Sequence, residues 1–173
     1  MKFGLYSLIF LAITLQSCRN NNEELFRIQM EARIDIGSGL NSIETHVFVL
    51  KDVVSNMQAL MFQKSVTLDQ IKSVNPATAI MEGIFNNIDY SIVEEITINI
   101  IDSEDPTMKR EVFYQEIIQL NHTGPLQLFG SLPDVKDILS KDNYDLEVEM
   151  RFRTPTTFTM ENSLLYTFVA YGE

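Results

Sequence analysis

The clearest feature of the chain is a strict alternation of apolar and polar residues. Between residues 26 and 36 every even-numbered position is apolar, from Phe26 to Ile36, and every odd-numbered one is charged or carries an amide. Successive side chains of a β-strand point to opposite faces, so this pattern predicts a strand with one buried and one solvated face. Residues 144–152 repeat it. Further strands are predicted at 43–50, 78–85, 91–101, 110–120, 126–129 and 164–171.

The segment 43–50 differs from the two cleanest strands because both of its faces are apolar. Val47 and Val49 alternate with Phe48 and Leu50. Strands that are buried on both faces carry apolar residues on both. We therefore predict a central position in the sheet for this strand.

Residues 54–73 break the period of two and predict one or two short helices. Met57 and Met61 have helical spacing there, and we interpret them, with Phe62, as core residues. Such an insertion is expected to pack over an end or a face of the sheet.

Polar residues and prolines predict where helices begin and where the chain turns. Thr67 and Gln70 have the spacing of a capping box. Pro133 can open a helical segment at 134–140, because a proline in the first turn loses no helical hydrogen bond. Pro76, after an asparagine, is predicted to interrupt regular structure.

About eight strands with few helices favour an all-β fold. We predict an antiparallel β-sandwich of the immunoglobulin or transthyretin type, with one or two short helical insertions. No internal repeat or second domain is visible, so residues 25–173 are assigned to a single β-sandwich domain.

The first 17 residues have a different composition from the rest. Lys2 precedes an apolar run at 3–15, which is shorter than the roughly 20 residues that a membrane-spanning helix needs. A short positive start and an apolar run of this length are typical of a signal peptide. The segment ends in Leu-Gln-Ser-Cys at positions 15–18, which resembles the lipobox of bacterial lipoproteins. That resemblance implies that Cys18 carries the lipid and that residues 18–24 form a tether.

The charge balance limits the partners. The chain has a net charge of −11, and removal of residues 1–17 would leave 156 residues with a net charge of −12. Such a surface repels phosphate groups, so nucleic acid is excluded as a partner and membrane contact is expected through the lipid anchor alone. Arg19 follows the cysteine where the best-known inner-membrane retention signal has Asp, which favours the outer membrane. Cys18 is the only cysteine, so no intramolecular disulfide can form.

Residues that carry catalytic chemistry are few. The two histidines, His46 and His122, fall in a predicted strand and a predicted turn, and no motif places a base beside a nucleophile. We therefore predict no catalytic residue, no cofactor and no enzymatic activity. Most of five tyrosines are predicted to pack their rings and expose their hydroxyls: Tyr90, Tyr114, Tyr144, Tyr166 and Tyr171.

Two acidic groups are the best candidates for a metal site. Calcium needs several oxygen ligands that converge on one loop. The first group is Asp102, Glu104 and Asp105, and the second spans 142–145 with Asp142, Asn143 and Asp145. Neither has the spacing of a known calcium loop, so no metal site is predicted.

Two resemblances bear on function. Residues 44–52 are similar to a strand in the outer-membrane lipoprotein of the type VI secretion membrane complex, where a helix also follows. More of the chain resembles the uncharacterised small β-sandwich lipoproteins of Gram-negative envelopes. We predict a lipid-anchored, non-enzymatic accessory or interaction module with an envelope protein as partner, using sheet edges or residues 54–73. The alternatives are a carbohydrate- or calcium-dependent surface-binding module and a type VI secretion-like lipoprotein.

Overall fold

The structure is a computed structural model that describes residues 23–85 and 88–172. It has eight strands, all paired antiparallel, and two short helices, which confirms the predicted all-β class and strand number. The strands are β1 (Glu24–Ile36), β2 (Thr45–Val54), β3 (Ser73–Gly83), β4 (Val93–Asp102), β5 (Lys109–Gln115), β6 (Leu126–Gly130), β7 (Asn143–Phe152) and β8 (Met160–Tyr171). The helices are α2 (Met57–Lys64) and α3 (Lys136–Leu139), and single 3-10 turns lie at Leu68–Gln70 and Tyr90–Ile92.

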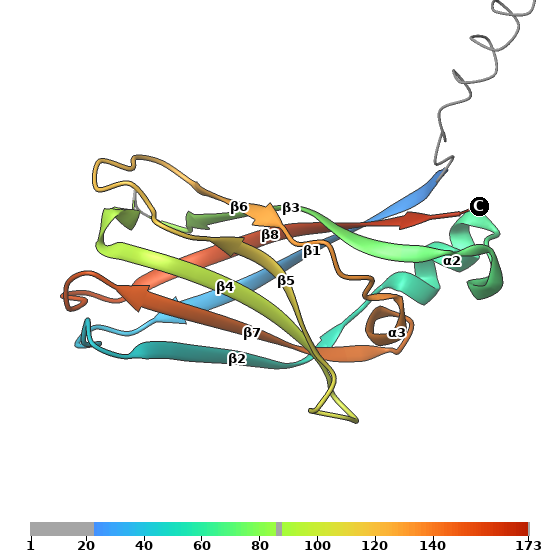
Figure 1. Ribbon diagram of the computed structural model, residues 1–173, viewed down its shortest axis with the longest axis horizontal. Coiled ribbons are helices and arrows are strands. Elements are labelled where there is room, and N and C mark those ends of the chain that lie inside the picture. Colours follow the sequence, from blue (N-terminus) through green and yellow to red (C-terminus); the bar gives the residue numbers. More distant parts are fainter. Residues whose placement is uncertain (1–22, 86–87, 173) are drawn as a thin grey trace, which may run out of the picture.

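The eight strands form one curled sheet. Their order is β1-β8-β3-β6-β5-β4-β7-β2. The half that contains β1, β8 and β3 faces the half that contains β4, β7 and β2 (Figure 1). The two halves meet where β5 and β6 pair, at Phe113 with Gly130 and Tyr114 with Phe129. The alternating apolar residues of both halves fill one hydrophobic core between them.

The strand β2 lies at an edge of the sheet, and the predicted central position was wrong. It pairs with β7, and no second strand pairs with it in the described part of the chain. Phe48 and Leu50 pack against the core, whereas Val47 and Val49 on the other face are 54% and 42% exposed. The pattern of a strand reports how apolar its two faces are, but it does not report which strands lie beside it.

The helix α2 is one of the short helices predicted within residues 54–73, whereas α3 is shorter than the segment predicted at 134–140. In α2, Met57 is buried, but Phe62 is 90% exposed, so its interpretation as a core residue was wrong. The capping box is confirmed: the backbone N–H of Thr67 donates to the Gln70 side chain over 2.8 Å. In α3, Ile138 is among the residues that close one end of the core.

The predicted break at Pro76 was also wrong, because this residue lies inside β3. The pairing of β3 with β8 shifts register between Pro76 and Thr78. A proline cannot donate to a ladder, and strands tolerate it at such irregularities. The ladder to β6 begins only at Thr78, beyond the proline.

Candidate functional site

The predicted lipid-attachment residue, Cys18, lies outside the described residues, as do residues 1–17. The first and last described residues lie side by side: the N–H of Gly172 donates to the carbonyl of Glu23 over 2.8 Å. Both ends lie at the α2 end of the sheet (Figure 1). Neither α2 nor any other helix of the described segments has the length and apolar character to cross a membrane.

The candidate interaction site is the outer face and free edge of β2, here called the β2 edge. Its apolar members, Val47, Val49 and Val54, are all exposed, and so is Ile43 in the preceding loop. An edge strand also presents unpaired backbone N–H and C=O groups on the side away from its neighbour. The β2 edge therefore combines free hydrogen-bonding groups with uncovered apolar side chains.

A buried carboxylate fixes the bend at the end of the β2 edge. Asp145 on β7 accepts from the Lys51 ammonium over 2.6 Å and from the backbone N–H of Asp52 over 3.1 Å. Asp52 has a left-handed backbone, with φ of 55°, where the register with β7 shifts. Burial of Asp145 disfavours its charge, but Lys51 and the N–H of Asp52 outweigh this effect and hold its pKa below the ordinary value. This contact holds the irregularity in β2 between Leu50 and Val53, where the register with β7 shifts.

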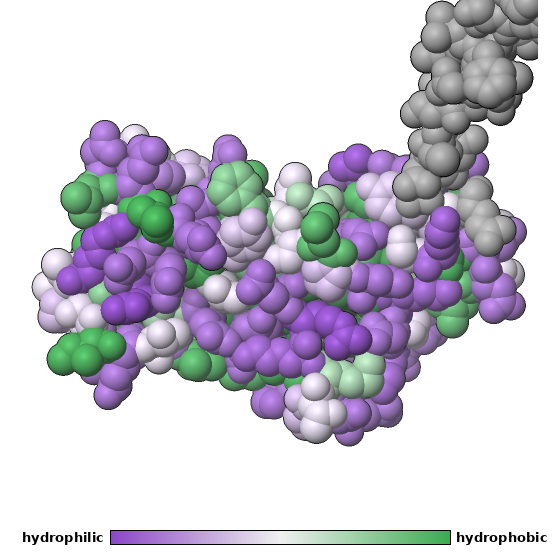
Figure 2. All heavy atoms as spheres, in the orientation of Figure 1, coloured by the Kyte–Doolittle hydropathy of each residue, from purple (hydrophilic) through white to green (hydrophobic). Residues whose placement is uncertain are grey.

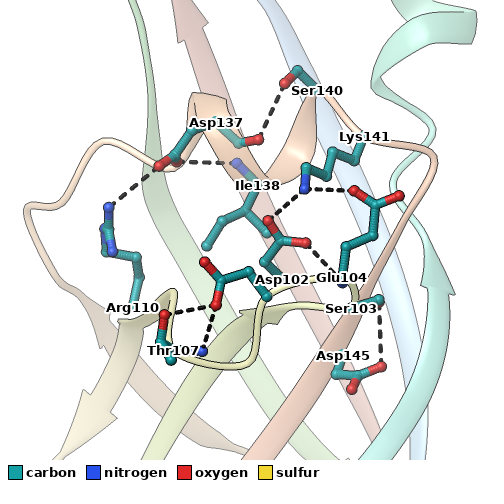
Figure 3. Close-up of polar contacts among 11 residues, drawn as sticks. Asp102, Ser103, Glu104, Thr107, Arg110, Asp137, Ile138, Ser140, Lys141 and Asp145 are labelled. Carbon is teal, nitrogen blue, oxygen red and sulfur yellow. Dashed lines mark hydrogen bonds and ion pairs between the residues drawn. The ribbon is translucent and has the colours of Figure 1, made fainter.

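The first acidic group is occupied by a lysine (Figure 3). The ammonium of Lys141 lies 2.6 Å from the buried carboxylate of Asp102 and 2.8 Å from that of Glu104. Burial opposes ionisation of Asp102, yet Lys141 and the N–H of Glu104 lower its pKa. The same contacts raise the pKa of Lys141. Asp105 instead accepts from the N–H and hydroxyl of Thr107, over 3.1 and 2.6 Å.

The second acidic group does not converge either. Asp145 binds Lys51, as described, and the backbone carbonyl of Asp142 accepts from the N–H of Ser55 over 2.9 Å. Across residues 23–85 and 88–172, no group of three or more His, Cys, Asp or Glu side chains is placed to hold a metal ion.

The two histidines lie apart, and both bind backbone carbonyls. Nε2 of His46 lies 2.9 Å from the carbonyl oxygen of Asn41, and its ring packs on Phe152 with centroids 5.7 Å apart. Nε2 of His122 lies 3.2 Å from the carbonyl oxygen of Gly124. These contacts orient the His46 ring on β2 and the His122 ring in the β5–β6 loop.

Three of the five tyrosines bury their hydroxyls, contrary to the prediction. Tyr144 and Tyr166 place their hydroxyl oxygens 2.6 Å apart in the core, and Tyr90 donates to Asn162 over 2.7 Å. Burial raises the pKa of Tyr166 to about 12 and raises that of Tyr144 further. The alternation of strand residues predicts which rings are buried. Whether a tyrosine hydroxyl is also buried depends on the hydrogen-bond partners that residues distant in the sequence bring to it.

Comparisons with known proteins leave the family open. No family model matches the chain, and no curated protein matches it. Among solved structures, a chain titled Desmodium yellow mottle tymovirus is 10% identical, with a TM-score of 0.27, over 92% of this chain and 95% of that one. A turnip yellow mosaic virus chain is 8% identical, with a TM-score of 0.29, over 91% of this chain and 86% of that one.

Proposed function

We propose that this chain is a lipid-anchored protein of the bacterial outer membrane, and that it serves as a non-enzymatic interaction module. Its β2 edge receives an extended segment of an envelope partner. One observation carries this proposal: β2 has the apolar pattern of a central strand but lies at an edge, with Val47 and Val49 uncovered. An added strand would satisfy the backbone groups and cover the valines at once.

The charge of the chain selects the chemistry of the partner segment. Glu44 and Asp52 are exposed near the two ends of β2. The whole chain carries a net charge of −11, so a second copy would bring like charge to this edge. The segment that fits is therefore extended, apolar at alternate positions and basic at its ends.

The finer fold belongs to the same proposal. We infer that the curled sheet is an immunoglobulin- or transthyretin-like β-sandwich whose halves join at β5 and β6. The short ladder between these strands, at Phe113 and Tyr114, supports two facing sheets with a narrow connection.

The anchor gives the module an orientation. Six peptide units separate Cys18 from the start of β1 at Glu24, a reach of at most about 22 Å. A lipid on Cys18 would hold the α2 end near the membrane. The loops at the opposite end would then point away from it (Figure 1).

Site-specific photo-crosslinking in cells tests the β2 edge. A photoreactive residue at position 49 should crosslink to an envelope protein, whereas the same residue at Gln29, exposed on β1, should not. The additional substitution Val47→Lys should abolish the crosslinked product from position 49, because a charge on an edge strand opposes strand addition. Equal products from both positions, or none from position 49, would exclude the β2 edge as the binding surface.

Metabolic labelling tests the anchor separately. Palmitate should label the wild-type chain and not Cys18→Ala. Label in both proteins, or in neither, would remove the lipid from the proposal while leaving the crosslinking result interpretable.

A further inference from the structure

A second surface, independent of the β2 edge, lies where β5, β6 and the loop between them meet. Two hollows, of about 420 and 490 Å³, adjoin there and share His122 and Thr123. Figure 2 shows hydrophobic residues among hydrophilic ones at this loop end of the molecule. The first hollow is here called the β5–β6 hollow. Its size is within the usual range for a small-ligand site.

Apart from His122, the polar side chains that line the β5–β6 hollow are uncharged. They include three carboxamides, from Gln115, Gln119 and Gln127, and the hydroxyl of Thr123. Each of these groups both donates and accepts hydrogen bonds. Although the chain has 24 acidic residues, none of the described lining residues is Asp, Glu, Lys or Arg. Such a lining suits a ligand with many uncharged hydroxyls, and it offers no carboxylate, lysine or arginine to a charged one.

An aromatic ring forms one wall of the β5–β6 hollow. Phe129 is 62% exposed, and its ring centroid lies 6.1 Å from that of Tyr114 on the neighbouring strand. Gln127 lies two residues before Phe129 on β6, so both side chains point to the same face. The C–H face of a sugar ring packs on an aromatic face while its hydroxyls reach nearby amides. Phe129 and Gln127 have this arrangement.

Hydrogen bonds fix the backbone of Ile118, which lines the hollow. The guanidinium of Arg153 donates to the backbone carbonyls of Ser91, Val93 and Ile118, with a distance of 3.0 Å to Ser91. The N–H of Ile118 also donates to the carbonyl of Glu94 over 3.0 Å. A site that is formed before binding loses less entropy when its ligand arrives.

The backbone beside the hollow is strained. Ile117 has φ of 52° and is 79% exposed. A β-branched residue in the left-handed region is an outlier, and strain of this kind is concentrated at binding sites. This observation is separate from the lining chemistry, and it marks the same loop.

We propose that the β5–β6 hollow binds neutral oligosaccharides without a metal ion. Phe129 stacks on a sugar ring, Gln127 and Gln119 bind its hydroxyls, and Arg153 positions the loop. The proposal does not depend on strand addition at β2. It places a glycan-binding surface at the end of the domain opposite the predicted anchor.

Isothermal titration calorimetry on the full-length chain in detergent tests the proposal. The neutral probes are maltohexaose, cellohexaose and xylohexaose, and the acidic probe is tetragalacturonate, each with and without EDTA. At least one neutral probe should bind equally in EDTA, and tetragalacturonate should bind at least tenfold more weakly. Failure of every neutral probe, loss of binding in EDTA, or preference for the acidic probe would overturn the proposal.

Matched variants locate the binding. Phe129→Ala and Gln127→Ala should each weaken binding at least tenfold, because each removes a side chain that contacts the ligand. Their controls are Phe62→Ala and Gln29→Ala, which change exposed residues of the same types on α2 and β1. All four substituted residues are exposed, so each variant should give the same circular dichroism spectrum as the wild type. Equal affinity of the two sets would exclude this hollow as the site.

Discussion

The two edge strands of the sheet, β1 and β2, are built in opposite ways. Every apolar residue on the inner face of β1, from Phe26 to Ile36, is buried, and its outer face carries charged residues. The apolar residues on the inner face of β2 are only half-buried, and Val47 and Val49 lie on its outer face. Both strands end the same sheet, so position alone does not explain the difference.

The difference indicates that β1 is protected against pairing with another strand and that β2 is not. Charged side chains protect an edge strand from pairing with other chains. On β1, Arg27 pairs with Glu24 at 2.8 Å, and Arg33 pairs with Glu161 on β8. On β2, Lys51 turns away to Asp145, and the valines stay uncovered. The four predictions below test this contrast, beginning with the largest expected effect.

Core truncations should separate the two strands most strongly. Ile34→Ala on β1 removes a fully packed side chain and should destabilise the fold by about 3 kcal/mol. Leu50→Ala on β2 should cost roughly 1 to 2 kcal/mol, because Leu50 is only half-buried. Urea unfolding measures both. Equal losses would mean that the inner faces of β1 and β2 contribute alike.

The buried carboxylate beneath β2 should give a pH-dependent effect. The pKa of Asp145 is lowered in the folded state, so its contribution is present above the ordinary carboxyl pKa and is lost as pH falls through the lowered one. Asp145→Asn should cost about 1 to 2 kcal/mol at pH 7. The gap to wild type should begin to narrow below about pH 4 and close as pH falls through the lowered pKa.

Asp35→Asn on β1 is the matched control for Asp145→Asn. Asp35 is exposed and lies 3.4 Å from Arg33. An exposed ion pair contributes little to stability, so the free energy of unfolding at pH 7 should change by less than about 0.5 kcal/mol. A gap between wild type and Asp145→Asn that does not narrow as pH falls below about 4 would contradict a role for the charge.

Charge introduced at the β2 edge should affect binding and not stability. Val47→Lys and Val49→Lys change exposed side chains, so each should change the free energy of unfolding by no more than about 0.5 kcal/mol. Thermal melting measures this effect, with Gln29→Lys on β1 as the control. A loss above about 2 kcal/mol would mean that the valines already pack against something and are not a free surface.

Removal of a β1 surface charge should have the smallest effect. Arg33→Ala loses its exposed pairs with Glu161 and Asp35 and should change stability by less than about 0.5 kcal/mol. The change should fall further in high salt, because salt screens exposed charges. A larger, salt-independent loss would show that the Arg33 stem packs on the sheet.

Much of the fold could be predicted from the sequence, because alternation is a local property. The pattern at Phe26–Ile36 and at residues 144–152 located β1 and β7 nearly to the residue. The capping box at Thr67 and Gln70 is equally local, and it formed as predicted. Strand ends were less accurate where a loop residue such as Ile117 continued the apolar pattern beyond β5.

The candidate sites were harder to predict, because they depend on neighbours that are distant in the chain. Nothing in the local sequence shows that Lys141 lies between Asp102 and Glu104, or that Lys51 meets Asp145. The glutamines of the β5–β6 hollow carried no motif. Residues of ordinary type became a candidate site only because two strands and a loop bring them together.

The sequence by itself determined the class of the fold, the segments that form strands and the acidic character of the surface. These follow from side-chain period and composition, which need no knowledge of long-range contacts. Only the tertiary structure decided that β2 is an edge, since a period of two defines two faces and not the order of strands. That order depends on which apolar faces close the core most completely, and it left Val47 and Val49 at the surface.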